Sequence, residues 1–394
     1  MAQDRRSLEK RRRCERSAAA LVDCLDMLIE ILLRLPAKKI FRTKAVSKEW
    51  YSIISDPIFV VNYAKRNSKS LLGFILNGRR APSPEFFFIS LRGNTSRPAR
   101  DPEFINIPQI KIENICKGLL CYSQPHMDDS GFTSYYVCNP TSGQTKRISV
   151  LDHSDNRRVM SVDLAFDPLK SAFYNLIFVT ELSRSESQQL IKIGTYSSKT
   201  QSWSYGLHNL AYEVGFGHGV HCNGAFYWRH VRNNSVSYFD LEVNCIQNLG
   251  IPQMTSEPYR TNIGYLGESG GRLHLVRTCR PSSIRFTIFE MKDDRSGWLV
   301  KCQGDFGNLV ACFPRMGRFA HGPFQFNLMN LFEGEREEDL NILLKIPGGV
   351  VQYNAKDNTS RKLRGLPRGC VYGEFSFFHW TSKSYQCIET LACI

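Results

Sequence analysis

The chain has 394 residues, of which 42% are hydrophobic and 12% aromatic. This is more apolar material than one small core needs, so we expect two or more globular domains. The formal net charge is +14, but the excess of Lys and Arg is spread along the chain, which makes nucleic acid an unlikely partner. No run of 18 apolar residues occurs, so we expect no membrane partner.

The first 20 residues, MAQDRRSLEKRRRCERSAAA, are basic and lack the apolar stretch of a signal peptide. We expect residues 1–20 to form a disordered tail. Its cluster Lys10, Arg11, Arg12 and Arg13 is a candidate nuclear-import signal. A solvated arm is an equal alternative, and a nucleic-acid arm is a weaker one because no folded element with base-reaching side chains is visible. The 13 cysteines show no paired spacing, so free thiols in the nucleus or cytoplasm are expected.

Helical periodicity begins next. Apolar residues recur at i, i+3, i+4, i+7 and i+8, namely Leu25, Leu28, Ile29, Leu32 and Leu33. Pro36 ends this helix and suits the first turn of a second one. Ser47 can cap a third helix, which the segment SDP at 55–57 closes. Three short helices bury too little apolar surface to be stable alone, so this segment needs a partner.

The string LIEILLRLPAKKIFRTKAVSKEWYSIISDPIFV at 28–60 resembles an F-box of the plant type, with a Leu-Pro step, a VSKxW helix and an SDPxF ending. The resemblance implies that residues 21–66 dock the Skp-type adaptor of a cullin-based ubiquitin ligase. By position, the implied adaptor-binding residues are Leu28, Ile29, Leu32, Leu35, Pro36, Val46 and Trp50. The pattern departs at Asp23-Cys24, where F-boxes usually have Leu-Pro. The alternative is a helical cap in which these residues are merely core.

From residue 71 the pattern changes to short apolar and aromatic runs broken by turns, which indicates an all-β domain. Five segments share the order strand, polar turn, strand: YYVCNPTSGQTKRI, IGTYSSKTQSWS, VSYFDLEVNCIQNL, FTIFEMKDDRSGWLV and GVVQYNAKDNTSRKL. Their equivalent turn positions are Asn139, Ser197, Asp240, Met291 and Asn354, at intervals of 43 to 63 residues. A period near 50 is typical of propeller blades.

Upstream of several repeats lies a companion segment opened by glycine: KGLLCY, NGAFYW and GGRLHLV. We expect each glycine to form the tight turn that begins an inner strand. The order resembles a degenerate kelch blade, and GLLCY, VCNPTSGQ, LAFDP, GVHCNGAFYW and FDLE resemble an F-box-associated domain over about 110–310. The expected fold is a small all-α F-box of three short helices followed, over 71–394, by an all-β kelch-like propeller of six to eight blades. The strands at 71–91 and the chain after 365 are expected to complete one another's partial blades.

Catalytic patterns are weak. His218, His221 and Cys222 lie close together, but without a second pair at zinc-ligand spacing we expect packing and turn roles and no metal. Asp163 and Asp167 in DLAFDP indicate a turn more simply than paired catalytic carboxylates. The sequence has no GxSxG, HExxH or Walker motif. We therefore expect no catalysis and no cofactor.

The resemblances imply a substrate-recognition subunit of an SCF-type (Skp, cullin, F-box) ubiquitin ligase. The F-box would dock the Skp-type adaptor and, through it, a cullin, while the propeller would bind an unidentified target protein. Two alternatives stay open. One is a non-ligase propeller interaction module with a degenerate F-box, and the other is an enzyme with a site in the propeller channel.

Overall fold

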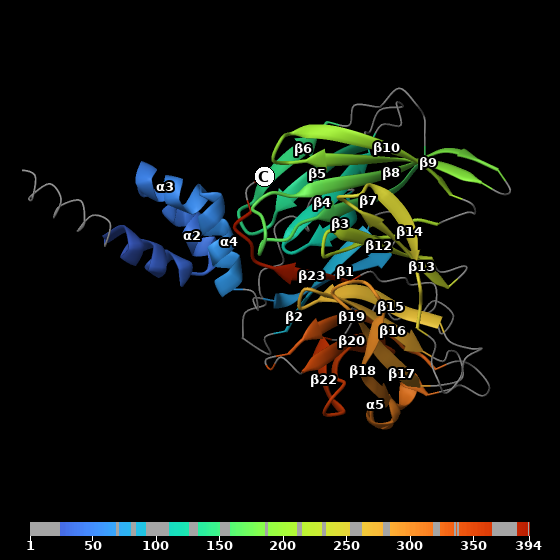
Figure 1. The fold of residues 1–394 in the computed structure, drawn as a ribbon. Coiled ribbons are helices and arrows are strands. Elements are labelled where there is room, and N and C mark those ends of the chain that lie inside the picture. The colour runs from blue at the N-terminus through green and yellow to red at the C-terminus, as the bar shows by residue number, and fades with distance from the viewer. Residues whose placement is uncertain are drawn as a thin grey trace, which may run out of the picture.

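Figure 1 shows the computed structural model, in which a helical module projects from one side of a β-propeller. It describes residues 24–67, 71–79, 84–91, 110–125, 133–149, 158–185, 188–210, 215–230, 234–252, 262–278, 284–317, 324–334, 336, 339–364, 384–392 and 394.

The helical module contains a helix through residues 24–33 and three labelled helices, α2 (Ala37–Thr43), α3 (Lys48–Ser55) and α4 (Pro57–Arg66). Pro36 precedes α2, as predicted, and the Ser47 hydroxyl caps α3 by accepting a hydrogen bond from the Trp50 amide at 3.2 Å. The expectation of three helices was incomplete. Asp56 accepts from the Ile58 amide and proline occupies the first turn, so the SDP segment that ends α3 also starts α4.

The propeller has six sheets, five of them four-stranded. Their strands are, sheet by sheet, β3 (Lys111–Cys116), β4 (Leu119–Pro125), β5 (Thr133–Asn139) and β6 (Gln144–Ile148); β7 (Val159–Ala165), β8 (Asn175–Arg184), β9 (Gln189–Ser197) and β10 (Ser202–Leu210); β11 (Val220–Cys222), β12 (Ala225–His230), β13 (Ser235–Asp240) and β14 (Cys245–Leu249); β15 (Asn262–Ser269), β16 (Arg272–Thr278), β17 (Arg285–Met291) and β18 (Trp298–Asp305); β19 (Asn327–Glu333), β20 (Leu340–Ile346), β21 (Gly349–Asn354) and β22 (Thr359–Arg364).

The sixth sheet joins the two ends of the domain. Its order is β2–β1–β23, with β1 (Leu71–Arg79) and β2 (Pro84–Ser90) from the beginning of the propeller and β23 (Ser384–Ile388) from the end. Leu71 lies opposite Ile388 and Leu76 opposite Ser384 in antiparallel register. The predicted completion of one partial blade by another is thus confirmed.

The innermost strands form a closed ring, because β23, β3, β7, β11, β15 and β19 each contact the next and β19 contacts β23 again. Each innermost strand is hydrogen-bonded on one side only, and the ring places its short free edge toward the protected channel. Six blades lie within the predicted range of six to eight, and the predicted fold class is confirmed. A short helix α5 (Gly307–Cys312) and a 3-10 turn (Pro314–Met316) follow β18.

The five predicted repeats are the hairpins between the third and fourth strands of the four-stranded blades. Each predicted turn position is the last residue of a third strand, namely Asn139, Ser197, Asp240, Met291 and Asn354. The glycine-opened segments differ from the expectation, since they begin second strands. In each, a two-residue turn such as Lys117-Gly118, with φ of 45° and 90°, leads out from the innermost strand.

Alternation explains which face each strand buries. In the first half of β9 burial alternates, with Ile191 and Ile193 buried on either side of the half-buried Lys192, whereas the outer strand β10 is largely exposed. Apolar clusters fill the space between neighbouring blades, and Trp228 is among the largest fully buried side chains. The nine cysteines in the described ranges are unpaired. None of the described helices combines the length and apolar character that crossing a membrane requires.

Candidate functional site

The helical module is seated on the propeller through a shared core. Leu32, Ile40 and Ile54 are fully buried in it, and two propeller residues, Ala172 and Leu391, belong to the same cluster. Figure 1 shows α4 on the side of the module that faces the propeller. The Tyr63 hydroxyl on α4 donates to the Leu35 carbonyl at 3.1 Å, while burial, with a smaller effect of Glu389, raises its pKa to about 12. The two parts therefore pack as one unit.

The seven predicted adaptor-binding residues occupy different environments. Val46 is 64% exposed and Pro36 is also exposed. Leu28, Ile29, Leu35 and Trp50 are half-buried at the edge of the module's core, where each can still present part of its surface. Leu32 is wholly buried, so any effect on adaptor binding must come through the packing of its neighbours. The docking role of the set stays a prediction.

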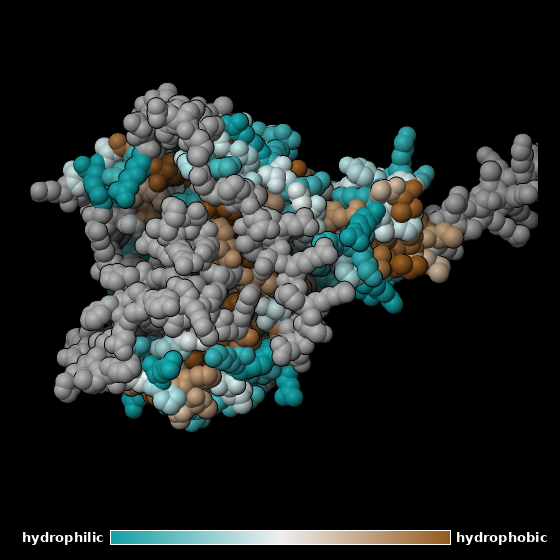
Figure 2. All heavy atoms as spheres, turned by 180° about the vertical axis from the view of Figure 1, so that it is seen from behind, coloured by the Kyte–Doolittle hydropathy of each residue, from teal (hydrophilic) through white to brown (hydrophobic). Residues whose placement is uncertain are grey.

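The solvent side of the module carries further large apolar residues, which were not among the predicted adaptor-binding residues. They are Leu25, Met27, Ile31, Tyr51 and Ile58, all exposed. Figure 2 shows apolar side chains gathered on the part of the module that projects from the propeller. The sequence held a signal for two of them, because Met27 and Ile31 are four residues apart and give the first helix a second apolar stripe. Leu25, predicted on the inward face, is 44% exposed.

The C-terminal segment ties the module to the propeller. After β23 it runs between the two, where Figure 1 shows it in red. The Asn139 side chain donates to the carbonyls of Thr390 and Ala392, at 3.1 and 2.8 Å. A Cβ on Gly118 would lie 2.5 Å from the Ile388 carbonyl oxygen, so the turn before β4 needs glycine. Leu391 is thereby held in the module's core.

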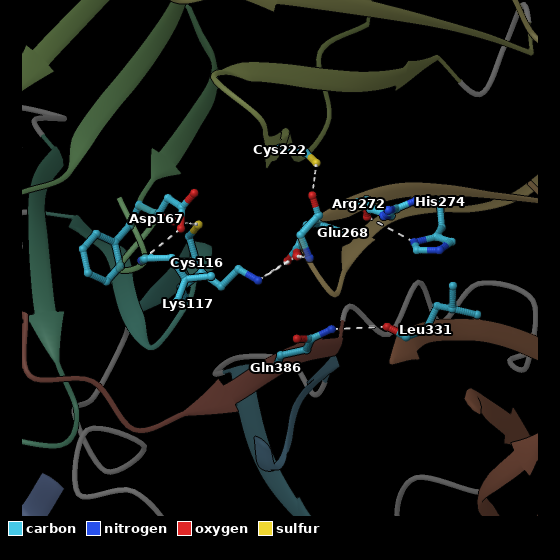
Figure 3. Close-up of polar contacts among 12 residues, drawn as sticks. Cys116, Lys117, Asp167, Cys222, Glu268, Arg272, His274, Leu331 and Gln386 are labelled. Carbon is cyan, nitrogen blue, oxygen red and sulfur yellow. Dashed lines mark hydrogen bonds and ion pairs between the residues drawn. The ribbon is translucent and has the colours of Figure 1, made fainter. Parts of the chain in front are cut away.

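An ion pair lies at the end of the propeller channel nearest the helical module. Lys117 Nζ is 2.6 Å from the Glu268 carboxylate, which also accepts from the Gly271 amide at 2.7 Å (Figure 3). Burial alone would lower the pKa of Lys117, but Glu268 outweighs it and holds that pKa above its usual value. The two opposite charges of this pair thus neutralise each other.

A buried carboxylate joins three blades. Asp163 on β7 accepts hydrogen bonds from four donors, namely Asn114 Nδ2 at 2.8 Å, the Gly219 amide at 2.7 Å, Ser161 Oγ at 2.5 Å and Trp228 Nε1 at 2.9 Å. Burial raises its pKa, whereas the four donors lower it. Asp167 instead accepts from the Leu169 amide at 3.1 Å in a turn, as predicted. The structural role of Asp163 was not predicted, because the neighbouring Asp-Pro step indicates a turn and says nothing of the distant donors.

The histidines next to this channel do not form a metal centre. Among the described residues no group of three or more His, Cys, Asp and Glu has the arrangement of a metal site. Cys222 Sγ lies 3.5 Å from the Gly271 carbonyl, and His218 packs edge-on against Tyr385. Burial lowers the pKa of His221 to about 4, although Asp167 and Glu268 act in the opposite direction. His221 is therefore neutral at pH 7.

This depressed pKa predicts a pH dependence of stability. Below about pH 6.5 the unfolded chain protonates His221, whereas the folded chain does so only near pH 4. Stability from this residue is complete above pH 6.5 and is lost as the pH falls to 4, by roughly 3 kcal/mol. Urea denaturation at stepped pH should show His221→Gln losing less stability than the wild type over this window. Parallel profiles would contradict the assignment.

Lys10, Arg11, Arg12 and Arg13 lie outside the described residues, as does Asp23.

Comparison with known proteins assigns both parts. Residues 24–62 match the family model of the F-box domain, and residues 88–295 match that of the F-box associated beta propeller domain. The second match covers more than half of the chain, which therefore belongs to that family. Together with the relatives below, the two matches make it a plant F-box protein with a C-terminal propeller.

Its relatives in Arabidopsis thaliana carry the same description. F-box protein At5g07610 is 29% identical over 95% of this chain and 93% of its own length. F-box/kelch-repeat protein At3g23880 is 26% identical, covering 70% of this chain and 77% of the relative. Among solved structures, a chain of a nidogen/laminin complex aligns with 82% of this chain and 100% of its own length at 12% identity, with a TM-score of 0.40, which is too distant to bear on function.

Proposed function

We propose that this protein is the substrate-recognition subunit of an SCF-type ubiquitin ligase. Its F-box binds a Skp-type adaptor and, through it, a cullin, while the six-bladed propeller binds a target protein. The observation that supports this most directly is the apolar surface of the F-box, which includes Met27 (65% exposed), Ile31 (57%) and Val46. Exposed apolar side chains of this size mark interaction surfaces.

The proposed mechanism is proximity. A target held on the propeller experiences a high effective concentration of the conjugating enzyme that other subunits carry. The shared core around Leu391 and Ala172 supports it, because a fixed angle between F-box and propeller holds the target in a defined position. No reactive residue of this chain takes part. The proposed site of action is the nucleus or the cytoplasm, with Lys10–Arg13 as the import signal.

Substitutions on the F-box surface test the proposal. We expect Ile31→Asp and Val46→Asp each to weaken binding of a purified Skp-type adaptor by about 100-fold or more, because a buried, unpaired carboxylate replaces an apolar contact. Both residues are exposed, so the fold should be retained. Leu207→Asp, on the outer strand β10 and 66% exposed, is the matched control and should bind normally. Affinity is measured by calorimetry on the full chain.

Unchanged affinity in both F-box variants would reject this surface as the docking site. If the wild-type chain binds target proteins but no adaptor, the alternative holds: a propeller interaction module whose F-box has lost docking. The departure from Leu-Pro at Asp23-Cys24 is the feature that favours this alternative, because proline there would restrict the chain before the first helix.

A further inference from the structure

The propeller channel contains a cavity of about 550 Å³, within the size range of small-molecule sites. Five innermost strands contribute to its wall, and Arg229 and Thr278 reach it from the second strands β12 and β16. Apolar side chains, among them Val220, Ile263 and Leu328, share the wall with amide and hydroxyl groups. The wall is thus mixed, with polar and apolar groups side by side, which suits an organic ligand that has a polar end and an apolar part.

The charges on this wall do not balance. Lys117 and Glu268 neutralise each other across 2.6 Å. Arg229 donates one hydrogen bond, from Nη1 to the Gly264 carbonyl at 3.0 Å, and has no carboxylate partner among the residues that the structure describes. Burial lowers its pKa, which reflects the cost of holding this charge away from water. One positive charge therefore faces the cavity uncompensated, at a cost in stability.

A second polar group, close to the backbone that this guanidinium contacts, lacks a hydrogen-bond partner among the described residues. Thr278 Oγ1 is buried without a hydrogen bond. It lies 3.4 Å from the position of a Cβ on Gly264, the residue whose carbonyl Arg229 contacts. The register of β15 shifts between Ile263 and Tyr265, so Gly264 sits in a bulge. The same shift occurs in the innermost strands β3, β7 and β19, but only β15 has a glycine there, and a strand glycine allows close approach to the backbone.

We propose that this cavity binds a small organic molecule bearing one carboxylate. Its carboxylate accepts from the free N–H groups of Arg229 and from Thr278 Oγ1, and its apolar part lies along Ile263 and Leu328. A single negative charge is favoured because one cation is uncompensated, and a dianionic phosphate would leave excess charge in a buried site. A free molecule is favoured over the acidic side chain of a target protein, since an Asp or Glu tip fills little of 550 Å³. The site is independent of adaptor docking.

The probes are propionate, hexanoate and 3-phenylpropionate, titrated calorimetrically into the full chain, each beside its uncharged amide. We expect at least one carboxylate to bind, and its amide to bind about 10-fold more weakly or worse, as loss of one charge-assisted contact predicts. A capped Gly-Asp-Gly peptide should bind more weakly than the best carboxylate. Stronger binding of the peptide would overturn the small-molecule assignment, and absence of saturation by all three acids at about 10 mM, a millimolar affinity limit, would overturn the site.

Two variants separate binding from folding. Arg229→Met removes the uncompensated charge, and Thr278→Val replaces the unpaired hydroxyl by a methyl group of similar size, so neither variant should be much less stable than the wild type in urea. Arg229→Met should lose carboxylate binding by about 10-fold or more, and Thr278→Val by about 5-fold, at the scale of one hydrogen bond. Equal binding by wild type and Arg229→Met, or a large loss of stability in either variant, would contradict the proposal.

Discussion

Removal of residues 384–394 is expected to abolish cooperative folding of the propeller. The deletion removes β23, the innermost strand of the closing blade. Residues Leu71 to Leu76 of β1 then lose the strand with which they pair. It also opens three separate apolar clusters, which contain Tyr385, Leu391 and Ala392. The loss of several core side chains, at roughly 2–5 kcal/mol for each large one, together with a strand is comparable to the 5–15 kcal/mol by which domains are usually stable. Circular dichroism and size-exclusion chromatography should show an expanded or aggregated chain with no thermal transition.

A smaller truncation is the matched control. Removal of residues 393–394 retains β23 and the hydrogen bonds from Asn139 to Thr390 and Ala392. We expect this chain to unfold cooperatively, with a midpoint only modestly below that of the full chain, because Ile394 packs at the edge of one apolar cluster. A cooperative transition in the longer deletion would show that the ring is stable without β23 and would contradict the closure described above.

Replacement of Asp163 by asparagine is expected to cost about 2–4 kcal/mol of stability, because the amide nitrogen would replace an oxygen that now accepts from two donors. Its four donors come from three consecutive blades, so the loss affects the ring itself. The isosteric change leaves packing unaltered. Urea denaturation measures the difference in unfolding free energy.

The control for this variant is Asp167→Asn in the same segment. Asp167 accepts from the Leu169 amide in an exposed turn, and asparagine can make the same bond. We expect a change below about 0.5 kcal/mol, as for most surface substitutions. Equal stability of the Asp163 and Asp167 variants would mean that the buried hydrogen bonds contribute nothing specific.

The sequence predicted best where a signal is local and ordered. Leu35-Pro36 and the capping Ser47 locate helix boundaries from a few neighbouring residues, and polar turns such as the one at Asn139 indicate the outer hairpin of a blade. Each depends on backbone preferences that are independent of the rest of the fold. The same preferences assigned the glycine-opened segments to the wrong strand of a blade, because a two-residue turn begins one strand and ends another.

Long-range features were beyond such reasoning. No local pattern states that Leu391 enters the core of a module more than 300 residues earlier, or that Asn139 binds the C-terminal backbone. In the sequence, Arg229 is one more basic residue of a strand. Only the fold shows that it contacts Gly264 at a shift of register and that the unpaired Thr278 hydroxyl is nearby. The channel site therefore follows from closure of the ring. Sequence periodicity predicts a ring of blades, but it does not predict which residues face one another across the channel.

The most direct test of the central claim is a calorimetric titration of the full chain with a purified Skp-type adaptor. The full chain is required because Leu391 and Ala172 complete the F-box core. We predict one-to-one binding with a dissociation constant in the micromolar range or tighter, about −8 kcal/mol or better. No heat of binding from a chain that circular dichroism shows to be folded would contradict the ligase assignment.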